Sequence, residues 1–111
     1  MPAEAKTIDA GLAERERVLR ILRNHEAEIR ARGVTRLRMF GSMARGEAGP
    51  ASDVDLLADI DRRIKFSLIE LVGLQHFLDD LLGRETQVGT SLENARPRIR
   101  RRIEADALEV F

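Results

Sequence analysis

The segment that most constrains the fold is residues 53–60, which read DVDLLADI. Apolar residues occupy every second position from Val54 to Ile60, and Asp53 and Asp55 take the first two alternate positions. Because successive side chains of a strand point to opposite faces, this pattern predicts a strand with one face in the core. The same alternation places the two aspartates side by side on the other face. The fold must therefore contain a sheet strand that begins with a pair of carboxylates.

Periodicity and turn residues predict the other elements. The expected order is helix 9–31, strand 35–40, loop or short helix 43–52, strand 53–60, helix 67–82, strand 84–90 and helix 97–107. Gly33 suits the end of the first helix, Ser67 and Glu70 have capping-box spacing, and Pro97 suits a first helical turn. This order predicts an α/β fold, of the α+β two-layer kind, with a small mixed β-sheet. A length of 111 residues predicts one domain, residues 1–111.

Two of the expected helices carry apolar stripes that should face the sheet. In the first helix the stripe comprises Leu12, Val18, Leu19, Leu22 and Ile29. In the second helix it comprises Leu68, Leu71, Val72, Leu78, Leu81 and Leu82. In the last helix Ile99 and Ile103 should form the inward side. The core is therefore expected between these helices and one face of the sheet.

Composition excludes several classes of function. Nineteen Lys and Arg balance nineteen Asp and Glu, and aromatic residues make up only 4%. A chain that wraps nucleic acid is usually basic, and one that binds single strands needs aromatic side chains for base stacking. The absence of cysteine excludes disulfides and thiolate metal sites, and we expect a cytoplasmic protein. Neither a signal peptide nor a membrane-spanning segment is visible in the sequence.

The chemistry predicted for this chain depends on residues 40–61. Two adjacent carboxylates repel each other unless a cation lies between them, and Mg²⁺ typically takes one or two protein carboxylates and completes its shell with water and phosphates. Gly41 and Ser42, which ten residues separate from Asp53, end a predicted strand. A glycine lets backbone approach a phosphate closely, and the fork of Arg45 can reach a phosphate oxygen. Together these features are typical of a nucleoside triphosphate site.

Each feature taken alone also has a plain structural explanation. A Gly-Ser dipeptide is most often a turn, an Asp-x-Asp at a strand start is most often a solvated polar face, and a single arginine most often lies on the surface. The interpretation as a nucleotide site therefore depends on the order and spacing of all three.

In that order and spacing the chain resembles a known family. Gly41–Ser42, Ala44–Arg45–Gly46 and Ser52–Leu57 (SDVDLL) are similar to the signature of the nucleotidyltransferase superfamily related to DNA polymerase beta. The short length and the ending RIRRRIEADALEVF resemble the minimal nucleotidyltransferases, which are often the antitoxin paired with a HEPN-domain toxin. The resemblance extends from about residue 35 to the end of the sequence. It implies the nucleotidyltransferase fold.

The resemblance also implies roles for individual residues. Gly41 and Ser42 would hold the β- and γ-phosphates, and Arg45 would support a phosphate. Asp53 and Asp55 would be the catalytic residues and would bind two Mg²⁺ ions that bridge the triphosphate. The implied reaction transfers a nucleoside monophosphate to a hydroxyl and releases pyrophosphate.

The chain departs from the family pattern at one position. Family members carry a third carboxylate on the next strand, where this sequence has Gln87 in the run from Gly83 to Thr90. An amide contributes a neutral oxygen, so a metal there loses one negative ligand. Glu85 lies on the same strand face, ~6.6 Å along the strand, and could replace the missing carboxylate only with a shifted register.

Two hypotheses follow, together with a weaker third. In the first, the chain is a Mg²⁺-dependent enzyme that moves AMP from ATP to a hydroxyl on a partner protein, with a HEPN-type toxin as the acceptor implied by resemblance. In the second, it is a nucleotide-binding module with little or no activity that neutralises its partner by docking, as Gln87 suggests. The third is transfer to RNA, which would use a basic cluster formed by Arg96, Arg98, Arg100, Arg101 and Arg102. That cluster could instead be a solvated helix face or a contact surface for an acidic partner. Self-association is also open.

Overall fold

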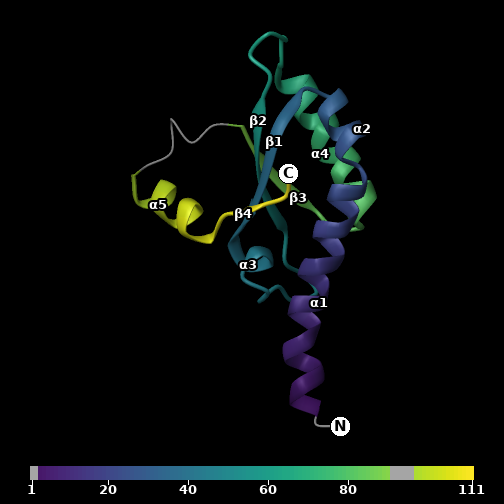
Figure 1. The fold of residues 1–111 in the computed structure, drawn as a ribbon, viewed down its shortest axis with the longest axis vertical. Coiled ribbons are helices and arrows are strands. Elements are labelled where there is room, and N and C mark those ends of the chain that lie inside the picture. The colour runs from purple at the N-terminus through teal and green to yellow at the C-terminus, as the bar shows by residue number, and fades with distance from the viewer. Residues whose placement is uncertain (1–2, 91–96) are drawn as a thin grey trace.

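The computed structural model describes residues 3–90 and 97–111, without the side chains of residues 3–9, Ile99 and Arg102. The elements in chain order are α1 (Ala3–Asn24), α2 (Glu26–Ala31), β1 (Val34–Phe40), α3 (Gly41–Ala44), β2 (Val54–Ile60), α4 (Leu68–Leu82), β3 (Thr86–Gly89), α5 (Pro97–Asp106) and β4 (Leu108–Glu109). Helices α1, α2 and α4 lie on one side of the sheet, and α5 lies on the other side (Figure 1).

The four described strands form one sheet in the order β3-β2-β1-β4. β2 pairs antiparallel with β1 and parallel with β3, and β4 pairs antiparallel with β1. The prediction of a small mixed sheet in an α+β fold is therefore confirmed. Strand β4 was not expected from the sequence, because two residues are too few to produce an alternating pattern.

The first helix differs from the prediction in two ways. It begins at Ala3 rather than near residue 9, and it is interrupted at His25, so that a short α2 follows α1. At His25 the backbone N–H donates to the carbonyls of both Ile21 and Leu22, each at 3.2 Å. The imidazole Nδ1 also lies 2.8 Å from the Ile21 carbonyl oxygen. The bond to Ile21 is an ordinary helical bond, while the bond to Leu22 belongs to a tighter turn, a local change that apolar periodicity does not reveal.

The boundaries of α4 agree with the expected signals. Ser67 and Glu70 form a capping box, and Gly83 ends the helix in the left-handed conformation at φ +65°. Gly33 likewise has φ +106° after α2, and Pro97 is the first residue of α5. The turn and cap residues were therefore better guides than apolar periodicity.

The core lies between the sheet and the helices α1, α2 and α4. Its fully buried side chains include Leu22, Ile29, Leu37, Met39, Leu56, Leu74 and Leu78. Three residues that were expected to face the core are exposed instead: Leu12 by 40%, Leu68 by 73% and Val72 by 42%. The buried stripe of α4 is Leu74, Leu78 and Leu82, with Leu71 and Leu81 partly buried against the core, so the first residues of that helix lie outside the core. Leu12 lies instead beside Gly46, in the segment that joins α3 to β2, where it stays partly exposed. Ile103 of α5 is half-buried, while the side chain of Ile99 lies outside the described residues.

Two side chains of α4 bind the outer side of β3. The Glu85 carbonyl accepts from the Val54 N–H, so the N–H groups of Thr86 and Val88 point away from β2. They donate to Asp79 Oδ1 at 2.7 Å and to Gln75 Oε1 at 3.0 Å. These bonds fix β3, and hence the start of the parallel pairing with β2, against α4.

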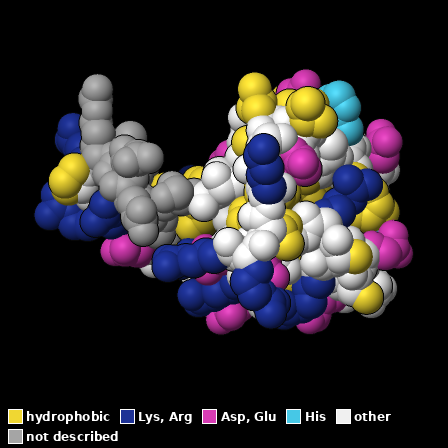
Figure 2. Space-filling view, turned by 90° about the horizontal axis from the view of Figure 1, so that it is seen from above, with side chains coloured by type: hydrophobic (Ala, Val, Ile, Leu, Met, Phe, Trp, Pro, Cys, Tyr) yellow, Lys and Arg dark blue, Asp and Glu magenta, His cyan; other side chains and the backbone are white. Residues whose placement is uncertain are grey.

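Charges of both signs cover the surface seen from the end where β2 leads into α4 (Figure 2). Lys and Arg side chains gather on the lobe formed by α5, whose described sequence carries Arg98, Arg100 and Arg101. The predicted basic cluster thus lies partly on this helix, while Arg96 and the side chain of Arg102 are outside the described residues. Within the described part of the chain, no helix combines the length and the apolar character needed to cross a membrane.

Candidate active site

The two aspartates lie at the start of β2, a central strand of the sheet. Asp55 pairs with Phe40 of β1 on one side and with Gln87 of β3 on the other. Asp53 immediately precedes the strand, beside Glu85 in the extension of the same parallel register. Leu56 and Ala58, on the opposite face of β2, are fully buried. The carboxylates therefore stand on a strand that the core holds rigidly, on the face that α1 and α4 do not cover.

The electrostatics of this pair favour a bound cation. Burial raises the pKa of the Asp55 carboxyl, and the negative charge of Asp53 raises it further. Among the described residues, no Lys, Arg or His forms an ion pair with either aspartate. Two carboxylates with partial burial and no cationic partner are a donor set that suits a hard divalent ion such as Mg²⁺.

Gly41 brings the backbone directly under this pair. Its φ of +75° lies in the left-handed region that favours glycine. A Cβ atom at this position would come within 2.6 Å of Asp55 Oδ2 and 3.5 Å of its Cγ. Both the conformation and the close approach therefore require glycine. The structure thus brings together the Gly-Ser dipeptide and the Asp-x-Asp pair, which the sequence separates by ten residues.

Ser42 lies in α3, a single helical turn that follows β1 directly. Met43 and Ala44 of this turn are buried and attach it to the core. The first N–H groups of a helical turn have no acceptor within the turn, and the Ser42 side chain is half-buried. Backbone donors and a hydroxyl therefore follow directly on Gly41, the residue that Asp55 approaches, and such donors can bind phosphate oxygens.

In the structure Arg45 forms ion pairs with two carboxylates outside the aspartate pair. Its Nη1 lies 2.7 Å from Asp106 Oδ2 at the end of α5, and its Nε lies 3.0 Å from Glu47 Oε2. The guanidinium is exposed, so these pairs can exchange with a ligand. In the structure Arg45 links the segment after α3 to α5 and does not face the two aspartates in any ion pair.

Gln87 occupies the position at which the family pattern has a third carboxylate. It pairs with Asp55 across the parallel β2–β3 ladder, so its side chain shares the face of Asp55. Glu85 falls opposite Asp53, two residues before the position that pairs with Asp55. The β2–β3 pairing shows no register shift that would bring Glu85 beside Asp55. Within the described residues no group of three His, Cys, Asp or Glu side chains is arranged to hold a metal. The described residues thus offer Asp53 and Asp55, and other ligands of a cation would come from phosphates and water.

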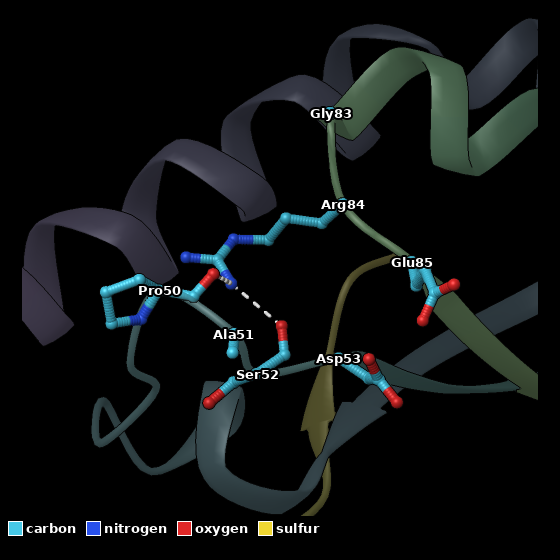
Figure 3. A pocket seen from close by; sticks show the side chains of 7 residues that line it. All are labelled: Pro50, Ala51, Ser52, Asp53, Gly83, Arg84 and Glu85. Atoms are coloured by element: carbon cyan, nitrogen blue, oxygen red, sulfur yellow. Dashed lines mark hydrogen bonds between the residues drawn. The ribbon is translucent and has the colours of Figure 1, made fainter.

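A pocket of about 210 Å³ opens beside Asp53. Its lining comprises Pro50, Ala51, Ser52, Asp53, Gly83, Arg84 and Glu85. The carboxylates of Asp53 and Glu85 lie on the same side of this pocket, and the Arg84 side chain extends across the segment from Pro50 to Ser52 (Figure 3). No role for Arg84 could be predicted from the sequence, because a single arginine after a helix has no recognisable motif.

A second feature that sequence reasoning missed is Gly11. A Cβ atom on Gly11 would overlap the carbonyl oxygen of Gly46, and the Cβ position of Gly46 lies 2.6 Å from Leu12 Cδ2. Helix α1 therefore passes in direct contact with the segment that joins α3 to β2. Only the combination of two distant glycines shows this contact, and each glycine alone has no such signal.

The nucleotidyltransferase domain family matches residues 19–110. This chain belongs to that family, and it is an enzyme domain of the nucleotidyltransferase class. The match covers every strand and all of the residues described above around Asp53 and Asp55. The resemblance inferred from the sequence signature is therefore confirmed, as is the fold that it implied.

Two curated relatives are similar to this chain over more than half of its length. A candidate protein adenylyltransferase of Methanocaldococcus jannaschii, MJ0126, is 34% identical over 91 residues, which are 81% of this chain and 91% of that protein. The protein adenylyltransferase MntA of Thermococcus cleftensis is 42% identical over 69 residues, 61% of this chain and 68% of that protein.

Solved structures agree with the fold. The structure of a candidate minimal nucleotidyltransferase has a TM-score of 0.60 and 31% identity, and the match covers 91% of this chain and 93% of that chain. A toxin–antitoxin structure with AMP-PNP has a TM-score of 0.64 at 16% identity, with 80% of this chain and 72% of that chain covered. The second likeness is one of fold alone.

Proposed function

We propose that this chain transfers AMP from ATP to a hydroxyl group of a partner protein, in a reaction that depends on Mg²⁺. The observation that carries the proposal is the position of the Asp55 carboxylate directly over Gly41, because it joins a cation site to a phosphate site. The names of the relatives MJ0126 and MntA support a protein as the acceptor. We also propose that residues 1–111 act as one minimal domain in the cytoplasm.

Each residue has a proposed part in this reaction. Asp53 and Asp55 would hold Mg²⁺, and two such ions stabilise the attacking and leaving oxygens of an in-line displacement. The N–H groups at Gly41 and Ser42, with the Ser42 hydroxyl, would bind the β- and γ-phosphates. Arg45 would support a phosphate after exchanging Glu47 or Asp106 for it.

The proposed transfer forms one bond and breaks another. The acceptor hydroxyl oxygen attacks the α-phosphorus of ATP, and the bond from that phosphorus to the bridging oxygen of pyrophosphate breaks. The hydroxyl proton is lost to solvent, and pyrophosphate leaves with the electron pair. Through the Mg²⁺ that they would hold, Asp53 and Asp55 would help to orient the α-phosphate, and the rigid β2 strand would limit their movement.

The partner is proposed to be a toxin of the HEPN type. A solved toxin–antitoxin complex with AMP-PNP shares this fold, which supports both a toxin partner and a nucleotide substrate. Transfer to RNA has less support, because the zero net charge and the 4% aromatic content disfavour RNA binding.

A labelling experiment tests the proposal. The protein is incubated with Mg²⁺ and ATP labelled at the α-phosphate, with and without the co-encoded partner. Label should pass to the partner, should vanish in Asp53→Asn, and should persist in Asp80→Asn, a matched change at an exposed aspartate of α4. Absence of label from every protein would contradict the proposal.

The alternative function is a nucleotide-binding module that neutralises its partner by docking. The observation in its favour is that Gln87 stands beside Asp55 where the family pattern has a carboxylate. This alternative predicts a tight complex with the partner that survives Asp53→Asn and forms without transfer of label. The same labelling experiment, followed by size-exclusion chromatography, therefore separates the two functions.

A further inference from the structure

Arg84 links the segment that precedes Asp53 to the rest of the fold. It stands between Gly83, which ends α4, and β3. From there its side chain crosses to residues 49–52, which lie between α3 and β2 and belong to no helix or strand (Figure 3). The guanidinium is largely buried, with only 14% of the side chain exposed. A buried arginine outside any helix or strand needs hydrogen-bond partners, and here its partners come from two directions.

The first set of partners is the backbone of the segment before Asp53. Arg84 Nη1 donates to the Ser52 carbonyl at 2.8 Å, to the Gly49 carbonyl at 3.1 Å and, more weakly, to the Pro50 carbonyl at 3.5 Å. Gly49 and Ser52 also bond to each other through the Gly49 N–H and the Ser52 Oγ at 2.9 Å. One cationic group therefore gathers the carbonyls of a four-residue turn.

The second partner is Glu14 of α1. Arg84 Nε lies 2.6 Å from Glu14 Oε2, and the same carboxylate accepts from Arg17, whose Nη2 also donates to the Leu82 carbonyl at 3.0 Å. The hydrogen bond from Arg17 and that from Arg84 hold the pKa of Glu14 at about 2. Glu14 is thus ionised at neutral pH, and it orients Arg84 from the side opposite the turn.

These bonds place Asp53 between two fixed points. The Ser52 carbonyl belongs to the peptide unit directly before Asp53, and the Val54 N–H, directly after it, donates to the Glu85 carbonyl at 2.9 Å. Arg84 and Glu85 are neighbours in sequence, so one short stretch of chain holds the backbone on both sides of Asp53. With Nε and Nη1 occupied by protein acceptors, Arg84 is suited to holding the backbone and not to binding substrate.

We propose that Arg84 is a positioning residue that fixes the Asp53 carboxylate for cation and nucleotide binding. The inference rests on the proposed function for its effect on binding, while its effect on the backbone can be measured independently. Without Arg84 the turn at residues 49–52 loses the donor shared by its carbonyls, and Asp53 loses its fixed direction.

The test uses Mn²⁺ as a paramagnetic substitute for Mg²⁺ and AMP-PNP as the nucleotide. Binding of Mn²⁺ in the presence of AMP-PNP is followed by electron paramagnetic resonance, and amide hydrogen exchange is measured on the same variants. We expect Arg84→Met to weaken Mn²⁺ binding by about tenfold or more, a loss equivalent to about 1.4 kcal/mol. Exchange at the Gly49 and Ser52 amides should accelerate, while exchange at Leu56 should not change.

Three further variants make the test discriminating. Arg84→Lys keeps the charge but lacks the planar fork, so it should weaken Mn²⁺ binding by an intermediate amount. Glu14→Gln keeps Arg84 and removes its anionic partner, so it should also weaken Mn²⁺ binding. This variant replaces Arg84→Met in the test if Arg84→Met does not fold. Arg63→Met is the control, because the Arg63 side chain is 89% exposed and, among the described residues, its ion pair is with Asp61, two positions earlier. This variant should change neither measurement.

The outcomes separate this inference from the proposed function. If the unmodified protein binds no Mn²⁺ with AMP-PNP, the proposed function is wrong, and the exchange data alone then decide whether Arg84 fixes the turn. If Arg84→Met folds and binds Mn²⁺ as the unmodified protein does, the positioning role is wrong. Unchanged exchange at Gly49 and Ser52 would also overturn it, whatever the affinity.

Discussion

The Asp55 carboxylate lies directly over Gly41, so that a Cβ atom on the glycine would come within 2.6 Å of Asp55 Oδ2. This relationship connects the end of β1 with the start of β2 at the level where Phe40 and Asp55 pair. It leaves no room for a larger residue at position 41 unless the carboxylate moves. The geometry of the proposed cation site is therefore coupled to the backbone that would bind phosphate.

The first prediction concerns Gly41→Ala. The left-handed backbone at Gly41 disfavours alanine by about 1 kcal/mol, and the new methyl group would displace the Asp55 carboxylate. We expect Mn²⁺ binding in the presence of AMP-PNP to weaken by about tenfold or more. The matched control is Gly73→Ala in α4, since Gly73 lacks a positive φ and the atom nearest to its Cβ position is Arg32 Nη1 at 3.7 Å. Equal losses in the two variants would contradict this explanation.

The second prediction concerns Gln87→Asp. The register places this position beside Asp55 on the exposed face, so an aspartate there would supply the third carboxylate of the family pattern. We expect the rate of label transfer to the partner to rise by about tenfold or more, because a cation would gain an anionic ligand. Gln87→Asn has the same length without the charge and should not raise the rate. No increase in Gln87→Asp would show that the amide does not limit transfer.

The third prediction concerns Asp55→Asn in buffer that contains a chelator. Burial and the charge of Asp53 raise the pKa of Asp55, so the ionised form is less favourable in the folded protein than in the unfolded chain. At neutral pH the charge of Asp55 therefore costs stability, and removing it should raise the thermal midpoint, by an amount that solvent screening limits. Asp80→Asn, at an exposed position of α4, should leave the midpoint nearly unchanged. A lower midpoint in Asp55→Asn would contradict this reading of the site.

The fourth prediction concerns Glu14 and acid. Its pKa is lowered from 4.5 to about 2 in the folded protein, so its stabilising effect is complete above pH 4.5 and is lost as the pH falls towards 2. Glu14→Gln should lower the free energy of unfolding at pH 7 by on the order of 1–2 kcal/mol, a loss limited by solvent screening.

Urea unfolding at pH 7, 4 and 3 checks this prediction. The difference between Glu14→Gln and the unmodified protein should shrink as the pH is lowered. The control is Glu16→Gln, since Glu16 is 58% exposed and pairs only with the adjacent Arg15; it should change the free energy of unfolding by less than about 0.5 kcal/mol at every pH. A difference for Glu14→Gln that is independent of pH would contradict the prediction.

Local signals in the sequence predicted most of the fold. Alternation along residues 53–60 identified β2 and the face that carries Asp55, and Ser67, Gly83 and Pro97 marked helix boundaries correctly. The errors arose where local hydrogen bonds or contacts between distant residues determine helix boundaries and burial. His25 bonds to two carbonyls of the preceding turn and interrupts the first helix, and Leu68 is exposed because the packing of α4 starts further along the helix.

The candidate site was only partly predictable for the same reason. Gly41 and Asp55 could be paired from their spacing, but the roles of Arg84 and Glu14 depend on residues 70 positions apart in the chain. Whether Gln87 or Glu85 stands beside Asp55 depends on the β2–β3 register. A one-residue slip would change the face of every side chain on β3, and the sequence pattern of four residues does not fix it.

The bonds from Asp79 and Gln75 to β3 also bear on how the molecule meets others. The outermost strand of a sheet is ordinarily a template on which a foreign strand can add, which leads to aggregation or to strand exchange between copies. Here the outward N–H groups of Thr86 and Val88 already have acceptors on α4, and the strand at the opposite edge is only two residues long. Both edges of the sheet are therefore protected against the addition of a further strand. Association through the loops, or through the sheet face that carries Asp53 and Asp55, is favoured over strand addition.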